Sequence, residues 1–320
     1  MEAQSVVVFG GTGFIGSHLV AALSEADYAV RVVTRHASRA MHLMPLPYVD
    51  IVEADVHDDA ALPRLVAGQC AAINLVGILH GSRGRPYGPE FRHAHVELPR
   101  RIAAACAEEG VPRFLHMSAL GADPDGVSMY QRSKGDGETA ARSQPTVAAT
   151  VFRPSVVFGP DDAFLNLFAR LQRYAPFVPL AGAHARFQPV YVGDVAEAFV
   201  RALRDGHTRH TVVELGGPHV YTLEELVHLA GRYSGHERPV FSLPDGLGRA
   251  QAALFELLPG EPVITRDNLD SMRVDNVVSP STKALTAEAL GIKLTPLEAV
   301  APAYLAPNAP IDVLRERAGR

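Results

Sequence analysis

The sequence predicts an α/β protein with a doubly wound parallel sheet and a smaller C-terminal cap subdomain. Residues 5–160 alternate between short runs rich in Val, Ile and Leu and stretches with helical periodicity. This alternation is typical of a parallel sheet covered by helices on both faces. A glycine-rich turn, GGTGFIG, joins the first apolar run to the first helical stretch. Beyond residue 160 the alternation loosens and prolines and glycines punctuate the chain, which predicts the cap.

The expected strands and helices follow this alternation. Apolar runs predict strands at 5–11, 29–35, 48–56, 71–79, 113–121, 149–160 and 211–217. Helical periodicity predicts helices at 15–26, 59–69, 97–110, 162–175 and 222–235, and a strand followed by a helix at 189–206. We therefore expect residues 1–159 and about 187–217 to form a nucleotide-binding domain. The cap would comprise residues from about 160 to 186 and from 218 to 305. Residues 306–320 would form a frayed tail.

Composition limits the class of protein. The 320 residues are 47% apolar and carry a net charge of −5, without a basic block, which argues against a nucleic-acid surface. Two cysteines far apart, Cys70 and Cys106, fit a reducing compartment. No signal peptide precedes the first apolar run, and no apolar run reaches the ~18–20 residues of a membrane span. We expect a cytoplasmic protein, with peripheral association at the cytoplasmic face of the inner membrane left open.

The turn at residues 10–16 predicts a dinucleotide site of Rossmann type. Gly10 permits a tight turn, Gly13 allows a pyrophosphate to approach the backbone, and Gly16 allows helix and strand to pack closely. The N-terminus of the helix that follows would face the phosphates. The expected ligands in this turn are Gly10, Thr12, Gly13, Phe14, Ile15 and Gly16.

The end of the second strand predicts NADP(H) rather than NAD(H). An acid at this position usually binds the ribose 2′-hydroxyl, whereas arginine accommodates a 2′-phosphate. The segment TRHASR has no carboxylate, and its expected ligands are Thr34, Arg35, Ser38 and Arg39. The alternative is that these arginines belong to an ordinary solvated surface. Ends of the third and fourth strands supply further expected contacts: Asp55, Val56, Leu75, Val76 and Gly77.

The pentapeptide YQRSK predicts acid–base chemistry. In a helix, Tyr130 and Lys134 share one face, so the lysine can stabilise a tyrosinate. A free tyrosine has a pKa of about 10, and activity near pH 7 requires roughly 4 kcal/mol of differential stabilisation. The pair would pass a proton to a carbonyl oxygen while the nicotinamide delivers hydride. The main alternative is that both residues hold the cofactor and no substrate turns over.

Together these motifs resemble the extended or atypical short-chain dehydrogenase/reductase superfamily, which includes NAD(P)-dependent sugar epimerases and dehydratases. The phrases are GGTGFIGSHLV, EADVHD, NLVGILH, HMSALGAD, YQRSK, FRPSVVFGP and QPVYVGDVAEA, in this order over nearly the whole chain. NLVGILH, RFQPVYVGDVA and TRDNLDSMRVDNVV are also similar to bacterial relatives of the short-chain-dehydrogenase-like accessory subunit of respiratory complex I.

The resemblance implies roles at matching positions. Tyr130 would be the acid/base, Lys134 its partner and ribose ligand, and Ser118 the hydroxyl that polarises a substrate oxygen. Arg153, Pro154 and Ser155 would border the nicotinamide. Two departures disfavour sugar-nucleotide chemistry: a short interval of 12 residues from Ser118 to Tyr130, and His95 where sugar-active relatives commonly show asparagine.

Three functions follow. The first is an NADP(H)-dependent oxidoreductase acting on the carbonyl or alcohol of a small, apolar substrate. The second is a non-catalytic NADPH-binding subunit associated with complex I or a membrane surface. The third is an epimerase or dehydratase that works by transient hydride transfer. None of them needs a metal, and the close histidine pairs, His93/His95 and His207/His210, are expected on loops or the surface.

A leucine-rich stretch at 247–260 predicts one more helix. Its apolar positions fall on one helical face: Leu247, Ala250, Leu254, Leu257 and Leu258. We expect this face to lie in the core or to cover a substrate pocket. A peripheral-membrane or partner-docking face is the alternative.

Overall fold

The structure, a computed structural model, describes residues 4–58, 60–260, 262–279 and 283–306. The chain divides into two compact units. The larger unit comprises Met1–Pro154, Gly193–Leu215 and Pro280–Lys293, and the smaller one Ser155–Val192, Gly216–Ser279 and Leu294–Arg320. Most of the tail expected to fray, 306–320, lies outside the described residues.

An eight-stranded parallel sheet forms the centre of the larger unit, in the order β14-β11-β6-β5-β4-β1-β2-β3. Its central strands β1, β4, β5 and β6 are buried on both faces, as their apolar runs predict, whereas the edge strands β3 and β14 are partly exposed. The predicted doubly wound parallel fold is therefore confirmed. The strands are β1 (Ser5–Phe9), β2 (Ala29–Thr34), β3 (Val49–Glu53), β4 (Ala71–Asn74), β5 (Arg113–Met117), β6 (Ala148–Pro154), β11 (Val212–Leu215) and β14 (Leu285–Thr286).

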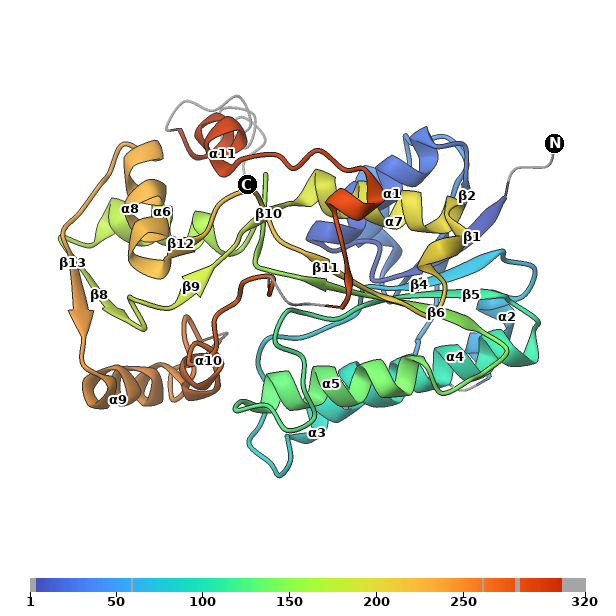
Figure 1. Cartoon of the computed structure of the whole chain (residues 1–320), viewed down its shortest axis with the longest axis horizontal. Coiled ribbons are helices and arrows are strands. Elements are labelled where there is room, and N and C mark those ends of the chain that lie inside the picture. Colours follow the sequence, from blue (N-terminus) through green and yellow to red (C-terminus); the bar gives the residue numbers. More distant parts are fainter. Residues whose placement is uncertain (1–3, 59, 261, 280–282, 307–320) are drawn as a thin grey trace. The chain divides into compact units, whose positions relative to one another are not determined.

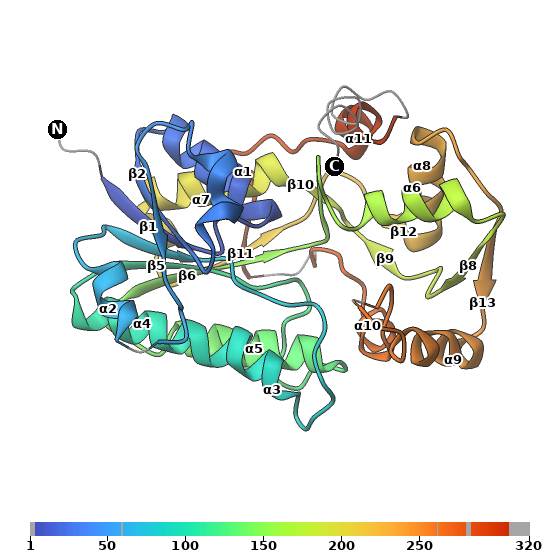
Figure 2. The same ribbon diagram turned by 180° about the vertical axis from the view of Figure 1, so that it is seen from behind.

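Helices cover both faces of this sheet (Figures 1 and 2). On one face lie α1 (Phe14–Glu25) and α7 (Val192–Arg204); on the other lie α2 (Ala61–Val66), α3 (Pro89–Phe91), α4 (Leu98–Glu108) and α5 (Met129–Ala141). Short helical turns complete the unit: η1 (Ala37–Leu43), η3 (Gly206–Thr208), η4 (Glu288–Leu290) and the π-helical η2 (Arg92–Glu97). Fully buried side chains such as Phe9, Leu98 and Phe114 fill the space between the sheet and α4.

The last strand of the sheet was expected in the cap. β14 pairs in parallel with β11, through Val213 opposite Leu285 and Glu214 opposite Thr286. The sequence placed 218–305 in the cap without interruption because a strand of two residues has no periodicity to detect.

The smaller unit consists of short two-stranded ladders and helices. The strand pairs are β7 (Val157–Phe158) with β10 (Val190–Tyr191), β8 (Val178–Ala181) with β13 (Val240–Leu243), and β9 (Arg186–Phe187) with β12 (Tyr221–Thr222). The helices are α6 (Leu165–Tyr174), α8 (Leu223–Tyr233), α9 (Asp245–Phe255), α10 (Arg266–Ser271) and α11 (Leu297–Leu305). Thr222 caps α8 through a capping box with Glu225. Two apolar clusters hold the unit, one around Phe158 and Leu226, the other around Val178 and Val227.

The expectation that the 247–260 face is core is wrong. Leu247, Leu254, Leu257 and Leu258 are 54–83% exposed, and Ala250 is also exposed. The charged side chains of this segment form partly exposed ion pairs: Arg249 binds Asp270, and Glu256 forms a two-bond pair with Arg266, both on α10. These pairs hold α9 to α10, while its leucines lie outside. No helix in the described part of the chain is long and apolar enough to cross a membrane.

Candidate nucleotide-binding and active site

The predicted cofactor residues gather at one edge of the large sheet. Strands β1 to β6 are all parallel, so the loops after them lie along the same edge. The strand order changes direction between β1 and β4, since β2 and β3 continue to one side of β1 and β4 to β6 to the other. Ligands of open α/β sheets bind at such a reversal, beyond the carboxyl ends of the strands.

The glycine turn has the conformation that a phosphate site needs. Gly10 has a φ of +82°, and its carbonyl accepts a hydrogen bond of 3.2 Å from the Gly13 N–H. A Cβ at Gly16 would lie 2.3 Å from the Gly10 oxygen, so only glycine allows α1 to start this close to the turn. Gly13 is the exposed N-cap of α1 and makes no side-chain cap. The first turn of α1 thus presents backbone N–H groups and the positive end of the helix dipole.

The loop after β4 packs against this turn. A Cβ at Gly10 would lie 3.1 Å from the Val76 nitrogen, and Leu75 donates its N–H to the Phe9 oxygen at 2.9 Å. The predicted contacts Leu75, Val76 and Gly77 are therefore brought next to the predicted phosphate turn. Asp55 and Val56 lie farther along the same edge, where the exposed Asp55 carboxylate accepts the His57 N–H at 2.9 Å.

The end of β2 carries charges of both signs. Arg35, Ser38 and Arg39 are exposed, and within the described residues neither arginine forms an ion pair. Thr34 is buried, and its hydroxyl donates to the His36 oxygen at 3.2 Å. The carboxylate of Glu53, at the end of β3, accepts the Ala37 N–H at 2.8 Å. The motif TRHASR does not reveal this carboxylate, because it arrives from a neighbouring strand.

Tyr130 and Lys134 share a face of α5, as their spacing predicts. The helix begins at a capping box formed by Ser128 and Gln131. The Lys134 Nζ lies 5.8 Å from the centre of the Tyr130 ring and donates to the Met117 oxygen at 3.2 Å, at the end of β5. Burial raises the pKa of Tyr130 to about 12 and lowers the pKa of Lys134 to about 8, with Glu138 opposing the second shift.

His95 belongs to the same cluster, which the expectation of a loop or surface position missed. It is 1% exposed, and its ring lies edge-on to Tyr130 with centroids 5.7 Å apart. Its Nε2 accepts the Ile78 N–H at 3.0 Å, and its Nδ1 lies 2.8 Å from the hydroxyl of Ser133. That hydroxyl donates to the backbone carbonyl oxygen of Tyr130. The Nδ1 therefore carries the proton. Burial, and then the charge of Lys134, hold the pKa of His95 well below its ordinary value, so the imidazole is neutral.

Ser118 lies at the end of β5, but its hydroxyl points to a carboxylate. Its Oγ donates to Glu138 Oε1 at 2.7 Å. Arg153, on β6, binds both Glu138 oxygens at 2.7 Å, which raises the pKa of the arginine, and lies 3.6 Å from Glu214. Glu138 was missed by the sequence analysis, although its position four residues after Lys134 places it on the same face of α5.

Ser155 is not part of this cluster. Arg153 and Pro154 end β6 in the larger unit, whereas Ser155 begins the smaller unit. Its hydroxyl donates to the side-chain oxygen of Asn276 at 2.6 Å, also within the smaller unit.

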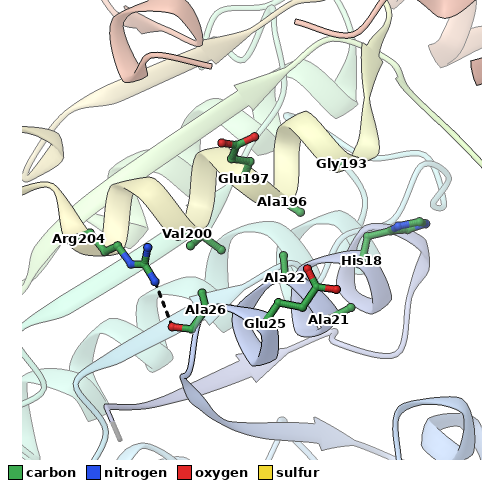
Figure 3. Close-up of a pocket in the computed structure, with 10 residues that line it drawn as sticks. All are labelled: His18, Ala21, Ala22, Glu25, Ala26, Gly193, Ala196, Glu197, Val200 and Arg204. Atoms are coloured by element: carbon green, nitrogen blue, oxygen red, sulfur yellow. Dashed lines mark hydrogen bonds between the residues drawn. The ribbon is translucent and has the colours of Figure 1, made fainter. Parts of the chain in front are cut away.

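A separate cavity of about 540 Å³ lies between α1 and α7 (Figure 3). Arg204 bridges the two helices by donating to the Ala26 oxygen at 3.0 Å. None of the predicted cofactor or catalytic residues lines it. The lining residues are His18, Ala21, Ala22, Glu25, Ala26, Gly193, Ala196, Glu197, Val200 and Arg204. The cavity is therefore distinct from the strand-end cluster of predicted site residues.

Comparison with known proteins identifies the family of the chain. Residues 6–216 match the NAD dependent epimerase/dehydratase family. The chain belongs to this family. The predicted superfamily is thereby confirmed, and the match includes every predicted cofactor and catalytic residue.

Curated relatives point to the predicted branch. The chain is 33% identical over 297 residues to a mouse protein named NADH dehydrogenase [ubiquinone] 1 alpha subcomplex subunit 9, mitochondrial, covering 91% of this chain and 77% of the relative. It is 30% identical over 249 residues to a ceramide reductase of Caulobacter vibrioides, covering 76% and 75% of the two chains.

Solved structures share the fold. The crystal structure of gox2253 superposes with a TM-score of 0.73 at 20% identity and covers 98% of both chains. A UDP-glucuronic acid 4-epimerase from Bacillus cereus, solved with UDP-glucuronic acid and NAD, gives a TM-score of 0.65 at 19% identity, covering 94% of this chain and 99% of that one.

Proposed function

We propose that this chain is an NADP(H)-binding oxidoreductase that interconverts a carbonyl and an alcohol, with Tyr130 as the acid–base group. One observation carries the proposal: Tyr130 and Lys134 share a face of α5, with the lysine Nζ 5.8 Å from the tyrosine ring and hydrogen-bonded to the end of β5. This is the sheet edge that carries the glycine turn. The spacing alone is common, but its position beside a nucleotide turn is not.

The residues present fit the cofactor. Gly16 and Gly10 leave no room for side chains where the turn meets α1, and the uncapped helix N-terminus favours an anion. Lys134, Val76 and Gly77 would hold the ribose and nicotinamide portion, and Arg35 and Arg39 the adenosine portion. Bound NADPH supplies hydride to the carbonyl carbon. Tyr130 gives its hydroxyl proton to the carbonyl oxygen, and solvent returns a proton to Tyr130.

The free protein does not yet make Tyr130 acidic. Its pKa of about 12 lies roughly 5 above neutral pH, which corresponds to about 7 kcal/mol. Lys134, with a pKa near 8, is mostly protonated at pH 7 and contributes a positive charge. The remaining stabilisation of a tyrosinate requires the positive ring of the oxidised cofactor. The proton-transfer group is therefore expected to function only in the nucleotide complex.

Turnover tests this function directly. Similarity to a protein named ceramide reductase favours an apolar substrate for this chain. The substrate panel should therefore contain long-chain ketones beside small aldehydes and sugar nucleotides. We expect NADPH oxidation with at least one substrate, reduced about 100-fold or more in Tyr130→Phe. Tyr174→Phe, on an exposed tyrosine of the smaller unit, is the matched control. Equal rates for Tyr130→Phe and the unmodified chain would refute the acid–base role.

Cofactor choice needs its own measurement, because Glu53 lies close to the two arginines. We propose NADPH over NADH, so NADPH should raise the melting temperature more than NADH does. Arg35→Ala should remove most of this difference. Arg209→Ala changes an exposed arginine just before β11, at the opposite sheet edge, and should leave it intact. Equal stabilisation of the unmodified chain by both nucleotides would exclude the preference.

A second candidate is a non-catalytic NADPH-binding subunit of a respiratory complex. Two observations favour it: relatives that are named subunits of NADH dehydrogenase, and a Ser118 hydroxyl already donated to Glu138. Such a subunit would retain NADPH through purification, show no turnover with the panel, and co-migrate with NADH:ubiquinone oxidoreductase activity in native gels of the source membranes. If the protein migrates apart from that activity and turns over a substrate, the subunit proposal is excluded and the oxidoreductase proposal stands.

A further inference from the structure

The Ser118 side chain is buried and has one hydrogen to donate. It is 3% exposed, and its backbone N–H already binds the Phe152 oxygen at 2.7 Å. Its hydroxyl hydrogen goes to Glu138 Oε1 at 2.7 Å. A hydroxyl donates only once, so the oxygen that remains can only accept.

Glu138 cannot be the donor in this contact. Two parallel bonds of 2.7 Å join both of its oxygens to the guanidinium of Arg153, the geometry of an ionised carboxylate with arginine. An ionised carboxylate has no hydrogen to give. Glu138 is 4% exposed, so water does not replace a hydrogen-bond donor that its carboxylate loses.

A substrate carbonyl therefore has no donor at Ser118. To polarise such an oxygen, the serine would have to turn its hydrogen away from a buried, charged acceptor. That would remove one of the three hydrogen bonds which satisfy Glu138 in a water-poor environment.

Ser118 and Met117 instead hold α5 against the end of β5. The Met117 oxygen binds Lys134 Nζ, and the next residue, Ser118, binds Glu138 one helical turn later. Arg153 adds a second strand, β6, to the same carboxylate. Tyr130, Lys134 and Glu138 are spaced by four residues, so the face that is held at two points also carries the tyrosine.

We infer that Ser118 is a positioning residue that fixes Glu138, and through it the face of α5 bearing Tyr130, and that it is not the hydroxyl that polarises the substrate. This contact from Ser118 to Glu138, the clamp, does not depend on turnover. Its consequence for catalysis rests on the proposed function. With Ser118 occupied, the proton for a carbonyl oxygen has to come from another group, and the proposed function assigns it to Tyr130. The lone pairs left on Ser118 suit a hydroxyl or amide hydrogen of a ligand instead.

A double-mutant cycle in denaturant, without nucleotide or substrate, tests the clamp. Ser118→Ala should increase the unfolding equilibrium constant on the order of tenfold to a hundredfold, as expected for loss of a bond to a charged group. In a Glu138→Ala background the same change should have an effect of less than about threefold, because the acceptor is gone. Ser143→Ala, on an exposed serine after α5, should be neutral in both backgrounds. Equal effects of Ser118→Ala in the two backgrounds would overturn the inference.

Two further measurements apply if Glu138→Ala does not fold. Ser118→Thr keeps the hydroxyl and should restore most of the stability lost in Ser118→Ala. Where turnover is found, Ser118→Ala should lower kcat by less than about tenfold and keep the pH profile, whereas Tyr130→Phe lowers it by about 100-fold or more. Ser118→Ala with unchanged stability and a kcat loss as large as that of Tyr130→Phe would show a substrate-polarising serine. Absence of turnover would remove the oxidoreductase proposal and leave the result of the cycle standing.

Discussion

Lys134 is a buried cation, so replacing it with methionine should stabilise the protein while removing its function. The pKa of Lys134 falls from 10.5 to about 8, chiefly through burial. At about 1.36 kcal/mol per pKa unit, this corresponds to a cost of about 3 kcal/mol for keeping the charged form in the folded state at neutral pH. Methionine has a similar volume and no charge, but it loses the hydrogen bond to Met117, worth about 1 kcal/mol. The net gain expected at pH 7 is roughly 2 kcal/mol, or about 3 °C in melting temperature for a chain of 320 residues.

The sign of the pH dependence follows from the direction of the shift. Between pH 8 and 10.5 the unfolded chain binds a proton at this lysine that the folded chain has released, so the stability of the unmodified protein rises with pH. The advantage of Lys134→Met should therefore shrink from roughly 2 kcal/mol at pH 7 to about zero at pH 10. Urea unfolding of both proteins at several pH values, without nucleotide, measures it.

A matched control separates burial from the loss of a lysine. Lys293 is exposed and lies in the same unit, so Lys293→Met should change stability by less than about 0.5 kcal/mol at either pH. The reasoning fails if Lys134→Met is less stable than the unmodified chain at pH 7. It also fails if the difference between the two proteins is the same at pH 7 and pH 10.

Four other changes test separate parts of the structure. Gly16→Ala places a Cβ 2.3 Å from the Gly10 oxygen and should abolish thermal stabilisation by NADPH; an undiminished shift would contradict the phosphate-turn assignment. Leu226→Ala, at a fully buried position, should cost about 2–5 kcal/mol in urea unfolding, whereas Leu257→Ser, at 83% exposure, should stay within about 0.5 kcal/mol. A large loss at Leu257 would mean that its face is covered in solution. Thr222→Ala should cost about 1 kcal/mol by removing the acceptor for the Glu225 N–H, and no loss would show that the capping box of α8 is dispensable.

The parallel strands, the glycine turn and the Tyr130–Lys134 pair were predictable because each depends on local pattern. Buried parallel strands give continuous apolar runs, the turn needs glycine at fixed positions, and a helix brings together residues four apart. The capping box at Thr222 is local in the same sense. These features are determined within a few residues of sequence, and the structure contains all of them.

The partners of the site residues were not predictable, because they come from distant segments. Glu138 on α5 meets Arg153 from β6, Glu53 reaches the loop after β2 from β3, and His95 approaches from η2. For α9, the sequence predicted the helix but not which of its faces is exposed. Its helical periodicity is real, but the ion pairs to α10 involve residues outside the stretch, so the pattern alone does not show that the leucines lie on the exposed side.

The π-helical segment Arg92–Glu97 gives the site an unusual sensitivity to insertions and deletions. A π-turn holds one residue more than the α-helical turn it replaces. Deleting one residue before His95 would let the segment relax to α-helical register and turn side chains within the segment by up to about 100° around the axis. His95 would then leave Ile78 on one side and Ser133 on the other, while α4 could keep its apolar face in the core. Length at this point of the chain therefore matters as much as residue identity, and a homologue one residue shorter here would have to build the neighbourhood of Tyr130 from a different side chain.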